Sequence, residues 1–247
     1  MDDFKNKVAI ITGGNSGIGY ATAKQLKEQG ATVIITGRRK EAIEKAALDL
    51  GVTAIVADQS NILDIEKLAS KVKEDFGQVD ILFINAGIAG LGNIEQATET
   101  LFDSIINVNF KGAYFTLSRF IPILNDNASV VFLSSNTASM PGPGSSIYSS
   151  SKTAVNSVMK SAALELAPRK IRVNSVSPGP TETEVMNKVG LDKTTVKSIM
   201  DVVIEKVPLK QMGASEDVAK MVAYLSSDAA KFITGADFIM DGGMVLA

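Results

Sequence analysis

The chain has 247 residues, of which 45% are hydrophobic and 21% charged, as expected for a globular protein with a sizeable core. The net charge of −2 offers no broad basic surface, so nucleic acid is not an expected partner. The absence of cysteine excludes disulfides and thiolate metal sites, and the absence of histidine removes the commonest metal ligand. Carboxylates alone remain for Mg²⁺ or Ca²⁺, but the sequence has no D-x-D-x-D-G loop.

No targeting or membrane segment is apparent in the sequence. The N-terminus is polar and has no apolar signal core behind it. No uninterrupted apolar run approaches the ~20 residues that a membrane span needs. We therefore expect a cytoplasmic protein with no membrane partner.

Short β-branched runs alternate with stretches of helical periodicity along the chain. In order, we expect strands at 8–12, 32–36, 53–57, 80–85, 129–134, 172–176 and 237–240. The expected helices lie between them, at 17–29, near 39–50, at 61–76, and about 99–123 and 147–166. Nearly continuous apolar strands separated by helices indicate a parallel sheet covered on both faces.

No linker or low-complexity segment divides the chain, so the sequence predicts one α/β domain, doubly wound, over residues 1–247. The stretch from about 180 to 212 breaks the alternation and contains no expected strand. We interpret it as an excursion over the sheet edge that acts as a lid; a pair of packed helices is the alternative.

The first strand is followed by the run T-G-G-N-S-G-I-G at 12–19, which leads into a helix. In open parallel sheets, ligands bind beyond the carboxyl ends of the strands. Glycines at 13, 17 and 19 would let the backbone approach a pyrophosphate, with the helix N-terminus facing its charge. The spacing is G-x-x-x-G-x-G rather than G-x-G-x-x-G. A tight strand–helix turn without a ligand is the plainer interpretation.

The second strand is followed by Gly37-Arg38-Arg39. Dinucleotide sites that prefer NAD usually carry an acidic residue here for the ribose 2′-hydroxyl, whereas arginine accommodates the 2′-phosphate of NADP. Because two guanidiniums are present and no acid, the sequence favours NADP(H) over NAD(H). The alternative is a solvated charge pair at a helix start.

Polar residues also follow the later strands. Asp58 could accept from an adenine amino group or simply cap a helix, and the amide of Asn85 could support the floor of a cofactor site. Ser134-Ser135 and the run from Pro178 to Thr181 follow the next two strands. Six strand ends with such residues are hard to attribute to chance.

Tyr148 and Lys152 are four residues apart in a predicted helix, so they share one face. A phenol ordinarily keeps its proton until pH ~10, and a nearby ammonium lowers that pKa. With no histidine or cysteine in the chain, this pair is the best candidate for acid–base chemistry. An ordinary surface pair at chance spacing is the alternative.

Over nearly its full length the chain resembles the short-chain dehydrogenase/reductases. The matching motifs are T-G-G-N-S-G-I-G at 12–19, Asp58, N-A-G at 85–87, V-N at 108–109, S-S at 134–135, Y-S-S-S-K at 148–152, P-G-P-T-E-T at 178–183, and the ending from Thr234-Gly235 to Asp241-Gly242-Gly243. The resemblance implies a Rossmann fold with seven parallel strands, a nicotinamide cofactor, and a homo-oligomer, either tetramer or dimer.

The resemblance also implies roles for individual residues. The implied catalytic set is Asn109, Ser135, Tyr148 and Lys152, with Asn109 holding a water in a proton relay. The implied cofactor-binding set is Gly13, Asn15, Ser16, Gly17, Ile18, Gly19, Arg38, Arg39, Asp58, Gln59, Asn85, Ala86, Gly87, Tyr148, Lys152, Pro178, Gly179, Thr181 and Thr183. Ser135 is preferred to Ser134 because it lies thirteen residues before Tyr148, as in the family.

The chain departs from the family pattern at three places. Gln59 stands where many relatives have an aliphatic residue, and Asn15-Ser16 lacks the basic residue of some NADP-preferring members. The loop at 125–127 has no arginine of the kind that acyl-carrier-protein ketoreductases often present, although Arg169 remains available.

The leading hypothesis is an NADP(H)-dependent oxidoreductase that transfers hydride between nicotinamide and a small carbonyl compound or secondary alcohol. A non-catalytic dinucleotide sensor or scaffold is the second hypothesis, and it would be free to lose the tyrosine or lysine that this chain keeps. An epimerase or dehydratase is the third, although such enzymes usually have a larger C-terminal domain.

Overall fold

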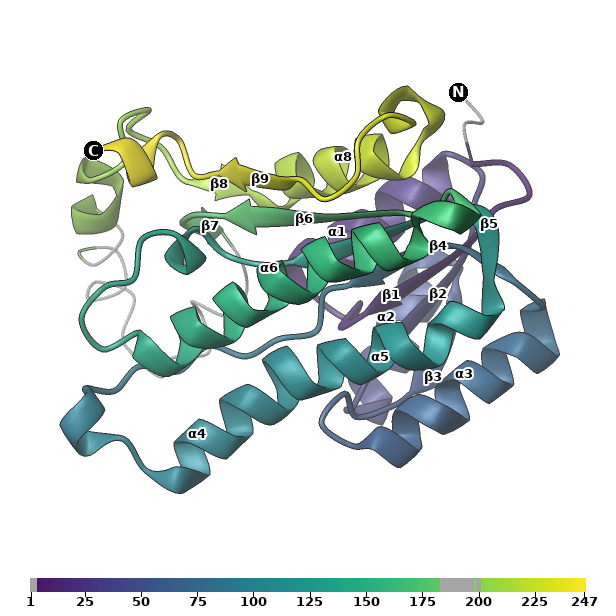
Figure 1. Cartoon of the computed structure of the whole chain (residues 1–247), viewed down its shortest axis with the longest axis horizontal. Helices are drawn as coiled ribbons and strands as arrows, with labels where there is room; N and C mark the ends of the chain where they lie inside the picture. The colour runs from purple at the N-terminus through teal and green to yellow at the C-terminus, as the bar shows by residue number, and fades with distance from the viewer. Residues whose placement is uncertain (1–3, 183–197, 199–200) are drawn as a thin grey trace.

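The computed structural model describes residues 4–182, 198 and 201–247. At its centre is a seven-stranded sheet, all parallel, in the order β3-β2-β1-β4-β5-β6-β9 (Figure 1). The strands are β1 (Val8–Thr12), β2 (Thr32–Gly37), β3 (Thr53–Val56), β4 (Val79–Ile84), β5 (Leu124–Leu133), β6 (Arg172–Pro178) and β9 (Asp237–Met240). The strand order reverses between β1 and β4, where open sheets of this type bind ligands. The expected doubly wound α/β fold is confirmed.

Helices cover both faces of the sheet. They are α1 (Gly17–Glu28), α2 (Lys40–Leu50), α3 (Ile62–Phe76), α4 (Glu99–Ile106), α5 (Ala113–Phe120), α6 (Ser146–Leu166) and α8 (Ser215–Ser226). One hydrophobic core joins the sheet to α3, α5 and α6, and a second joins it to α1, α2 and α8. Successive strand residues alternate between the two cores, as Ile10 and Ile11 of β1 do. This arrangement explains why the strands are apolar along their whole length.

The helical region expected at about 99–123 is one continuous rod with a change of pitch. Between α4 and α5 lies a π-helical segment, Asn107–Gly112, and the rod closes in a 3-10 turn at Ile121–Ile123. A Cβ on Gly112 would lie 2.1 Å from the carbonyl oxygen of Gln59, so this position admits no side chain as the backbone stands. The rod therefore packs directly against the loop that follows β3. π-helical segments are often found at functional sites.

Two expectations about secondary structure were wrong, and one helix was not predicted. β5 begins at Leu124, five residues before the expected start, because the polar residues of 125–127 extend the strand and its register shifts opposite β4. α8 was not expected, although Val218, Val222 and Ala219 place an apolar stripe at helical spacing. The two-residue strand β7 (Thr181–Glu182), paired with β8 (Gly213–Ala214), lies in a stretch expected to have no strand.

The lid expected at 180–212 falls mostly on residues outside the described part of the chain. Two-residue strands such as β7 and β8 are too short to show a hydrophobic pattern, so this pairing could not be predicted from sequence.

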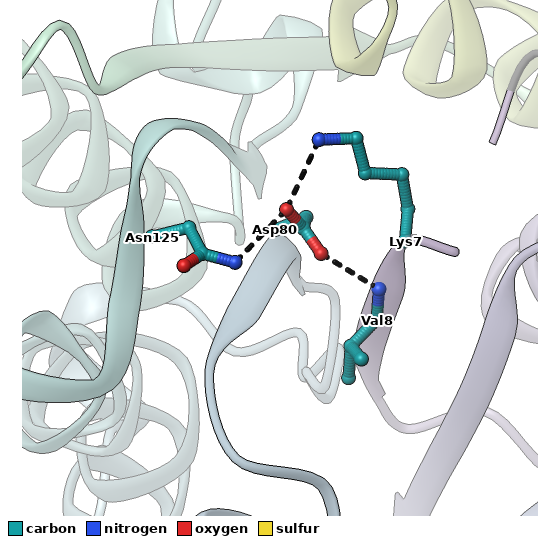
Figure 2. Close-up of polar contacts among 4 residues, drawn as sticks. All are labelled: Lys7, Val8, Asp80 and Asn125. Atoms are coloured by element: carbon teal, nitrogen blue, oxygen red, sulfur yellow. Dashed lines mark hydrogen bonds and ion pairs between the residues drawn. The ribbon is translucent and has the colours of Figure 1, made fainter. Parts of the chain in front are cut away.

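The amino ends of the central strands are fastened by one carboxylate (Figure 2). Asp80, at the start of β4, accepts from the backbone N–H of Val8 at 2.9 Å, from Asn125 Nδ2 at 3.0 Å and from Lys7 Nζ at 3.2 Å. These three donors come from the beginning of β1 and from β5. Asp80 thus sets how the three middle strands begin, at the edge of the sheet opposite the carboxyl ends.

Candidate active site

A crevice of about 660 Å³ opens at the carboxyl ends of β1, β2, β3 and β4 and extends to α6. Most of the predicted cofactor-binding residues line it: Gly13, Asn15, Ser16, Gly17, Ile18, Arg38, Arg39, Asp58, Gln59, Asn85, Ala86, Gly87, Tyr148 and Lys152. These residues come from five separate segments of the chain. The glycine turn, the two arginines and the tyrosine–lysine pair therefore belong to one cavity.

The glycine turn between β1 and α1 is compact because other groups occupy the space of its missing side chains. A Cβ on Gly19 would lie 2.3 Å from Gly13 O and 2.5 Å from Asn85 Nδ2. Gly13 itself has a φ of 67°, a conformation that favours glycine. Because Gly13 and Gly17 line the crevice without side chains, a ligand can approach their backbone closely, next to the N-terminus of α1, as a pyrophosphate requires.

The side-chain amide of Asn85 bonds the backbone of the glycine turn. Its Nδ2 donates to Thr12 O at 2.8 Å and to Gly13 O at 3.0 Å. The hydroxyl of Thr12 in return accepts from the backbone N–H groups of Asn85 and Ala86, both at 3.0 Å. These four bonds tie the end of β1 to the end of β4, so the floor of the crevice is rigid.

Arg38 and Arg39 are exposed at the rim of the crevice, after β2. Within the described residues, neither guanidinium forms an ion pair with a carboxylate. Asp58 uses Oδ1 to accept from the backbone N–H and the hydroxyl of Ser60, at 2.8 and 2.7 Å. Two cations at the rim with no carboxylate partner suit a ligand with a phosphate there.

Tyr148 and Lys152 lie one turn apart on α6, as expected, and both face the crevice. The ammonium of Lys152 is 5.8 Å from the centroid of the Tyr148 ring and donates to Leu133 O at 2.8 Å. Burial lowers the pKa of Lys152 to about 8. The ammonium is therefore a buried cation bonded to a backbone carbonyl, poised to exchange its proton near neutral pH.

The expected lowering of the Tyr148 pKa by Lys152 is not seen in this structure. Burial raises the pKa of Tyr148, and a hydrogen bond with Ser135 offsets part of that increase. The physical reason is that desolvation of the phenolate outweighs the stabilising contacts. The phenol is consequently protonated at neutral pH, in the state in which it can donate.

Ser135 lies at the end of β5, beside Tyr148, and caps the 3-10 turn η4 (Asn136–Ala138). It is buried, with 7% of its surface exposed. The hydroxyl of the neighbouring Ser134 donates instead to Lys152 O, at 3.3 Å. Of the two serines, Ser135 is the one whose side chain lowers the pKa of Tyr148 by hydrogen bonding.

Asn109 projects from the π-helical segment and is 1% exposed. Its side chain accepts from Ile88 N at 2.8 Å and donates to Ile88 O at 2.9 Å and to Ser151 Oγ at 3.2 Å. The Ser151 hydroxyl donates to Tyr148 O at 2.6 Å. Asn109 therefore connects the crevice wall after β4 to the turn of α6 that carries Tyr148.

Four of the predicted cofactor residues are not in the lining of the crevice: Gly19, Pro178, Gly179 and Thr181. Gly19 is packed beneath the turn, and a Cβ on Gly179 would lie 2.5 Å from Asp241 Cβ. Thr181 donates to Gly179 O at 3.0 Å. Thr183 lies outside the described residues.

Sequence reasoning missed several lining residues: Thr36, Gly37, Ala57, Ile88, Ala89, Val108 and Leu133. Most of them are apolar residues next to a motif residue, such as Val108 beside Asn109. They contribute backbone or apolar surface, so no chemical signal distinguishes them from core residues. Apart from Val108, which lies in the π-helical segment, they lie at a strand end or within five residues after one, and that position was the only available sign.

The described residues contain no cluster of three or more acidic side chains able to hold a metal ion. In the same part of the chain, no helix has the length and apolar character needed to cross a membrane.

Comparison with known proteins gives a consistent set of relatives. A family model described as "Enoyl-(Acyl carrier protein) reductase" matches residues 13–245. The NADP-dependent (R)-specific alcohol dehydrogenase of Lentilactobacillus kefiri is 36% identical over 98% of both chains. Dehydrogenase/reductase SDR family member 4 of Homo sapiens is 34% identical over 98% of this chain and 88% of its own length.

A solved structure shares the fold closely. It is the short-chain dehydrogenase/reductase SDR:Glucose/ribitol dehydrogenase from Brucella melitensis, with a TM-score of 0.92 and 32% identity over 98% of both chains.

Proposed function

Because the chain belongs to the short-chain dehydrogenase/reductase family of oxidoreductases, we propose that it reduces a ketone or aldehyde with NADPH and, in reverse, oxidises the corresponding alcohol. The observation that carries the proposal is the meeting of Tyr148 and Lys152 with the glycine turn in one crevice. A non-catalytic sensor would have no need of a buried cation beside a phenol. One relative, from Lentilactobacillus kefiri, has a name that states NADP dependence, which supports the choice of cofactor.

The residues of the crevice fit a nicotinamide dinucleotide. The turn around Gly13 and Gly19 would hold the pyrophosphate, since a side chain at Gly19 would collide with Gly13 O and Asn85 Nδ2 within the turn, and one at Gly13 would strain the backbone. Arg38 and Arg39 would hold a 2′-phosphate on the adenosine ribose. Asp58 would accept from the adenine amino group. The bound nicotinamide supplies the hydride for reduction, or accepts it for oxidation.

The proton comes from Tyr148. Burial raises the pKa of this phenol, so it stays protonated at neutral pH and can donate to the carbonyl oxygen of the substrate. Ser135 donates a hydrogen bond to the same oxygen, where negative charge develops. When the proton leaves, the cation of Lys152, one turn away, stabilises the phenolate that remains.

Asn109 is the fourth proposed catalytic residue, and it would help to replace the proton that Tyr148 gives to the substrate. A Cβ on Gly87 would lie 3.3 Å from Asn109 Oδ1 and 3.4 Å from Lys152 Nζ, so the amide and the ammonium approach the same point above this glycine. We assign to Asn109 a water that gives a proton back to Lys152 after the Lys152 ammonium has passed its own proton to the Tyr148 phenolate. Gly87 leaves the space that both side chains need.

A small-molecule substrate is favoured over an acyl group on a carrier protein. Arg169 was the remaining basic residue for a carrier-protein contact. Its guanidinium donates to Asp126 Oδ1 at 2.9 Å, to Ile121 O at 2.9 Å and to Leu124 O at 2.5 Å. An arginine with three internal partners is fixed in the protein framework, so it is a poor docking contact.

The cofactor assignment is tested by fluorescence titration of the purified protein with NADPH and NADH. We expect NADPH to bind at least about tenfold more tightly, since charge-assisted hydrogen bonds to phosphate contribute about 1.5–3 kcal/mol. The double variant Arg38→Ala/Arg39→Ala should lose this difference while NADH affinity is retained. Lys40→Ala is the matched control, because its ammonium pairs with Glu44 and Lys40 does not line the crevice. Equal or tighter NADH binding by the unaltered protein would overturn the assignment.

The reaction is tested by following consumption of reduced nicotinamide with a panel of ketones and aldehydes. Turnover that depends on the carbonyl compound is the expected result. Binding of cofactor without turnover on any carbonyl or secondary alcohol would instead support the sensor hypothesis.

A further inference from the structure

The hydroxyl of Ser135 receives two hydrogen bonds from one neighbour, Thr137. The backbone N–H of Thr137 donates to Ser135 Oγ at 3.2 Å, and its hydroxyl donates to the same oxygen at 3.0 Å. A serine hydroxyl has two acceptor lone pairs and a single proton. With both lone pairs engaged by Thr137, the proton of Ser135 must point away from that residue.

The remaining direction leads to the reacting groups. Ser135 hydrogen-bonds the Tyr148 phenol, and this bond lowers the pKa of Tyr148 against the larger effect of burial. Because Ser135 Oγ already accepts from both Thr137 groups, its O–H is left to donate toward the phenol, and a donor to the phenol oxygen favours the phenolate. The successive hydrogen bonds therefore run in one direction: the Thr137 hydroxyl donates to Ser135 Oγ, and the Ser135 O–H donates to the phenol oxygen or to a substrate oxygen beside it.

Thr137 is held in place from both sides of its turn. On one side, the Thr153 hydroxyl of α6 donates to Ala138 O at 3.1 Å. On the other, Asn136 Nδ2 donates to Asp241 Oδ2 at 3.4 Å, and Asp241 also accepts from Val245 N at 2.9 Å. The turn η4 is thus tied to α6 and to the C-terminal segment, and the Thr137 hydroxyl is pre-oriented before any ligand arrives.

We propose that Thr137 is a positioning residue that fixes the proton of Ser135 toward the oxygen on which charge develops. Without the Thr137 hydroxyl, a lone pair of Ser135 is free, and its O–H can rotate away from Tyr148 and the substrate. The role lies one step from the chemistry, since Thr137 acts only through Ser135. The inference rests on the proposed reductase function and refines its catalytic site.

The test compares Thr137→Val, which removes the hydroxyl at nearly constant volume, with Thr137→Ser, which keeps it. We expect Thr137→Val to lower kcat for reduction about tenfold, with cofactor affinity unchanged, because a donor to the developing oxyanion is no longer held in place. The apparent pKa of Tyr148 should rise in the same variant, since the bond that lowers it is weakened. Thr137→Ser should restore both quantities. Thr137→Ala gives the same comparison without an added methyl near Ser135.

The matched control is Thr153→Val, which loosens the same turn without touching Ser135. It should leave the pKa of Tyr148 where it is. Three outcomes would overturn the proposal: an unaltered kcat and pKa in Thr137→Val, no recovery in Thr137→Ser, or the same rise of the pKa in Thr153→Val.

The pKa of Tyr148 can be measured without turnover. The ultraviolet difference spectrum of phenolate formation is recorded during alkaline titration, and the spectrum of Tyr148→Phe is subtracted to remove the other three tyrosines. A rise of this pKa in Thr137→Val supports the positioning role even if no carbonyl substrate is turned over. Failure of the reductase proposal and failure of the Thr137 proposal are therefore distinguishable.

Discussion

The two edges of the central sheet use polar side chains in opposite ways. At the amino ends of the strands, Asp80 has three donors from two neighbouring strands. Arg172, at the start of β6, donates to two backbone carbonyls at the end of α8, those of Leu225 and Ser227. Asp80 thus faces three donors, and Arg172 has two carbonyls and the nearby carboxylate of Asp228.

At the carboxyl ends, charges are kept without carboxylate partners. Lys152 is buried, bonds a backbone carbonyl, and has its pKa lowered to about 8 by burial. Within the described chain, Arg38 and Arg39 pair with no carboxylate at the rim of the crevice. A buried cation with only a carbonyl for a partner lowers stability, so its presence indicates a use in binding or catalysis.

Polar residues at the amino ends of the strands therefore serve mainly stability, and those at the carboxyl ends serve mainly the proposed activity. Substitutions at the carboxyl ends should lower activity at little cost in stability, or even with a gain. Substitutions at the amino ends should lower stability and leave the chemistry of the folded protein intact. Three variants test this separation, beginning with the one expected to have the largest effect.

Tyr148→Phe removes one oxygen atom from the carboxyl-end site. We expect carbonyl reduction to fall by about 10³-fold, within the range contributed by a positioned general acid. Cofactor affinity should be nearly unchanged, and the free energy of unfolding should change by less than about 1 kcal/mol, a small effect for a single substitution. Steady-state kinetics, cofactor titration and urea unfolding measure the three quantities.

Unaltered turnover in Tyr148→Phe would remove the proposed proton donor from the mechanism. The pH profile of the unaltered protein gives an independent check. Burial raises the pKa of Tyr148, so reduction should persist through neutral pH and decline only in the alkaline range. A decline already near pH 6 would point to a different donor.

The contrast between the two edges also explains what could be predicted from sequence. Strand positions and their parallel order follow from apolar runs between helices, and the glycine turn and the Tyr148–Lys152 pair follow from spacing. Motif residues are recognisable because the chemistry limits which residue types can serve. The crevice, where such residues gather, was therefore largely predictable.

Packing against distant segments was not predictable. Asp80 binds Asn125, 45 residues away, and β5 starts early because the polar residues of 125–127 join the sheet through their backbone. The direction of the Tyr148 pKa depends on how much surface α6 loses to its neighbours, which no local spacing reveals. Thr137 carries no motif signal, since its role arises only from the turn geometry around Ser135.

In Lys152→Met, activity and stability should change in opposite directions. The folded-state pKa of about 8 lies below the ordinary 10.5, so the unfolded chain binds this proton more tightly than the folded protein does. The resulting loss of stability is complete below pH 8 and disappears above about pH 10.5. A pKa shift of this size corresponds to a destabilisation of roughly 3 kcal/mol, which Lys152→Met removes. The same substitution loses the hydrogen bond to Leu133 O, which contributes about 1 kcal/mol to stability.

We therefore expect Lys152→Met to be about 2 kcal/mol more stable than the unaltered protein at pH 7. The gain should shrink as the pH rises from 8 toward 10.5. Carbonyl reduction should fall by about a hundredfold or more, because the phenolate loses its cation. Urea unfolding at several pH values, combined with kinetics, measures both effects. A variant less stable than the unaltered protein at every pH would mean that the ammonium contributes to folding.

Asp80→Asn tests the amino ends and has the smallest expected effect on activity. The side-chain amide of asparagine keeps one acceptor oxygen, but its NH₂ group is itself a donor. It would face at least one of the three donors that now bond the carboxylate, from Val8, Asn125 or Lys7. A donor left without an acceptor in this partly buried place costs about 1–3 kcal/mol. We expect the free energy of unfolding to fall by that amount, while kcat and KM of the folded protein stay within about twofold of the original, a change below 1 kcal/mol.

Lys7→Met is the matched control, because it removes only the half-exposed ammonium, whose side chain is 52% accessible. Exposed ion pairs contribute about 0–1 kcal/mol, so this variant should lose much less stability than Asp80→Asn. Equal losses in the two variants would mean that the surface ion pair, and not the bonds to Val8 and Asn125, fastens the strands. A large fall in kcat for Asp80→Asn would show that the two edges are coupled, because strain at the start of β4 would then reach Asn85 at its end.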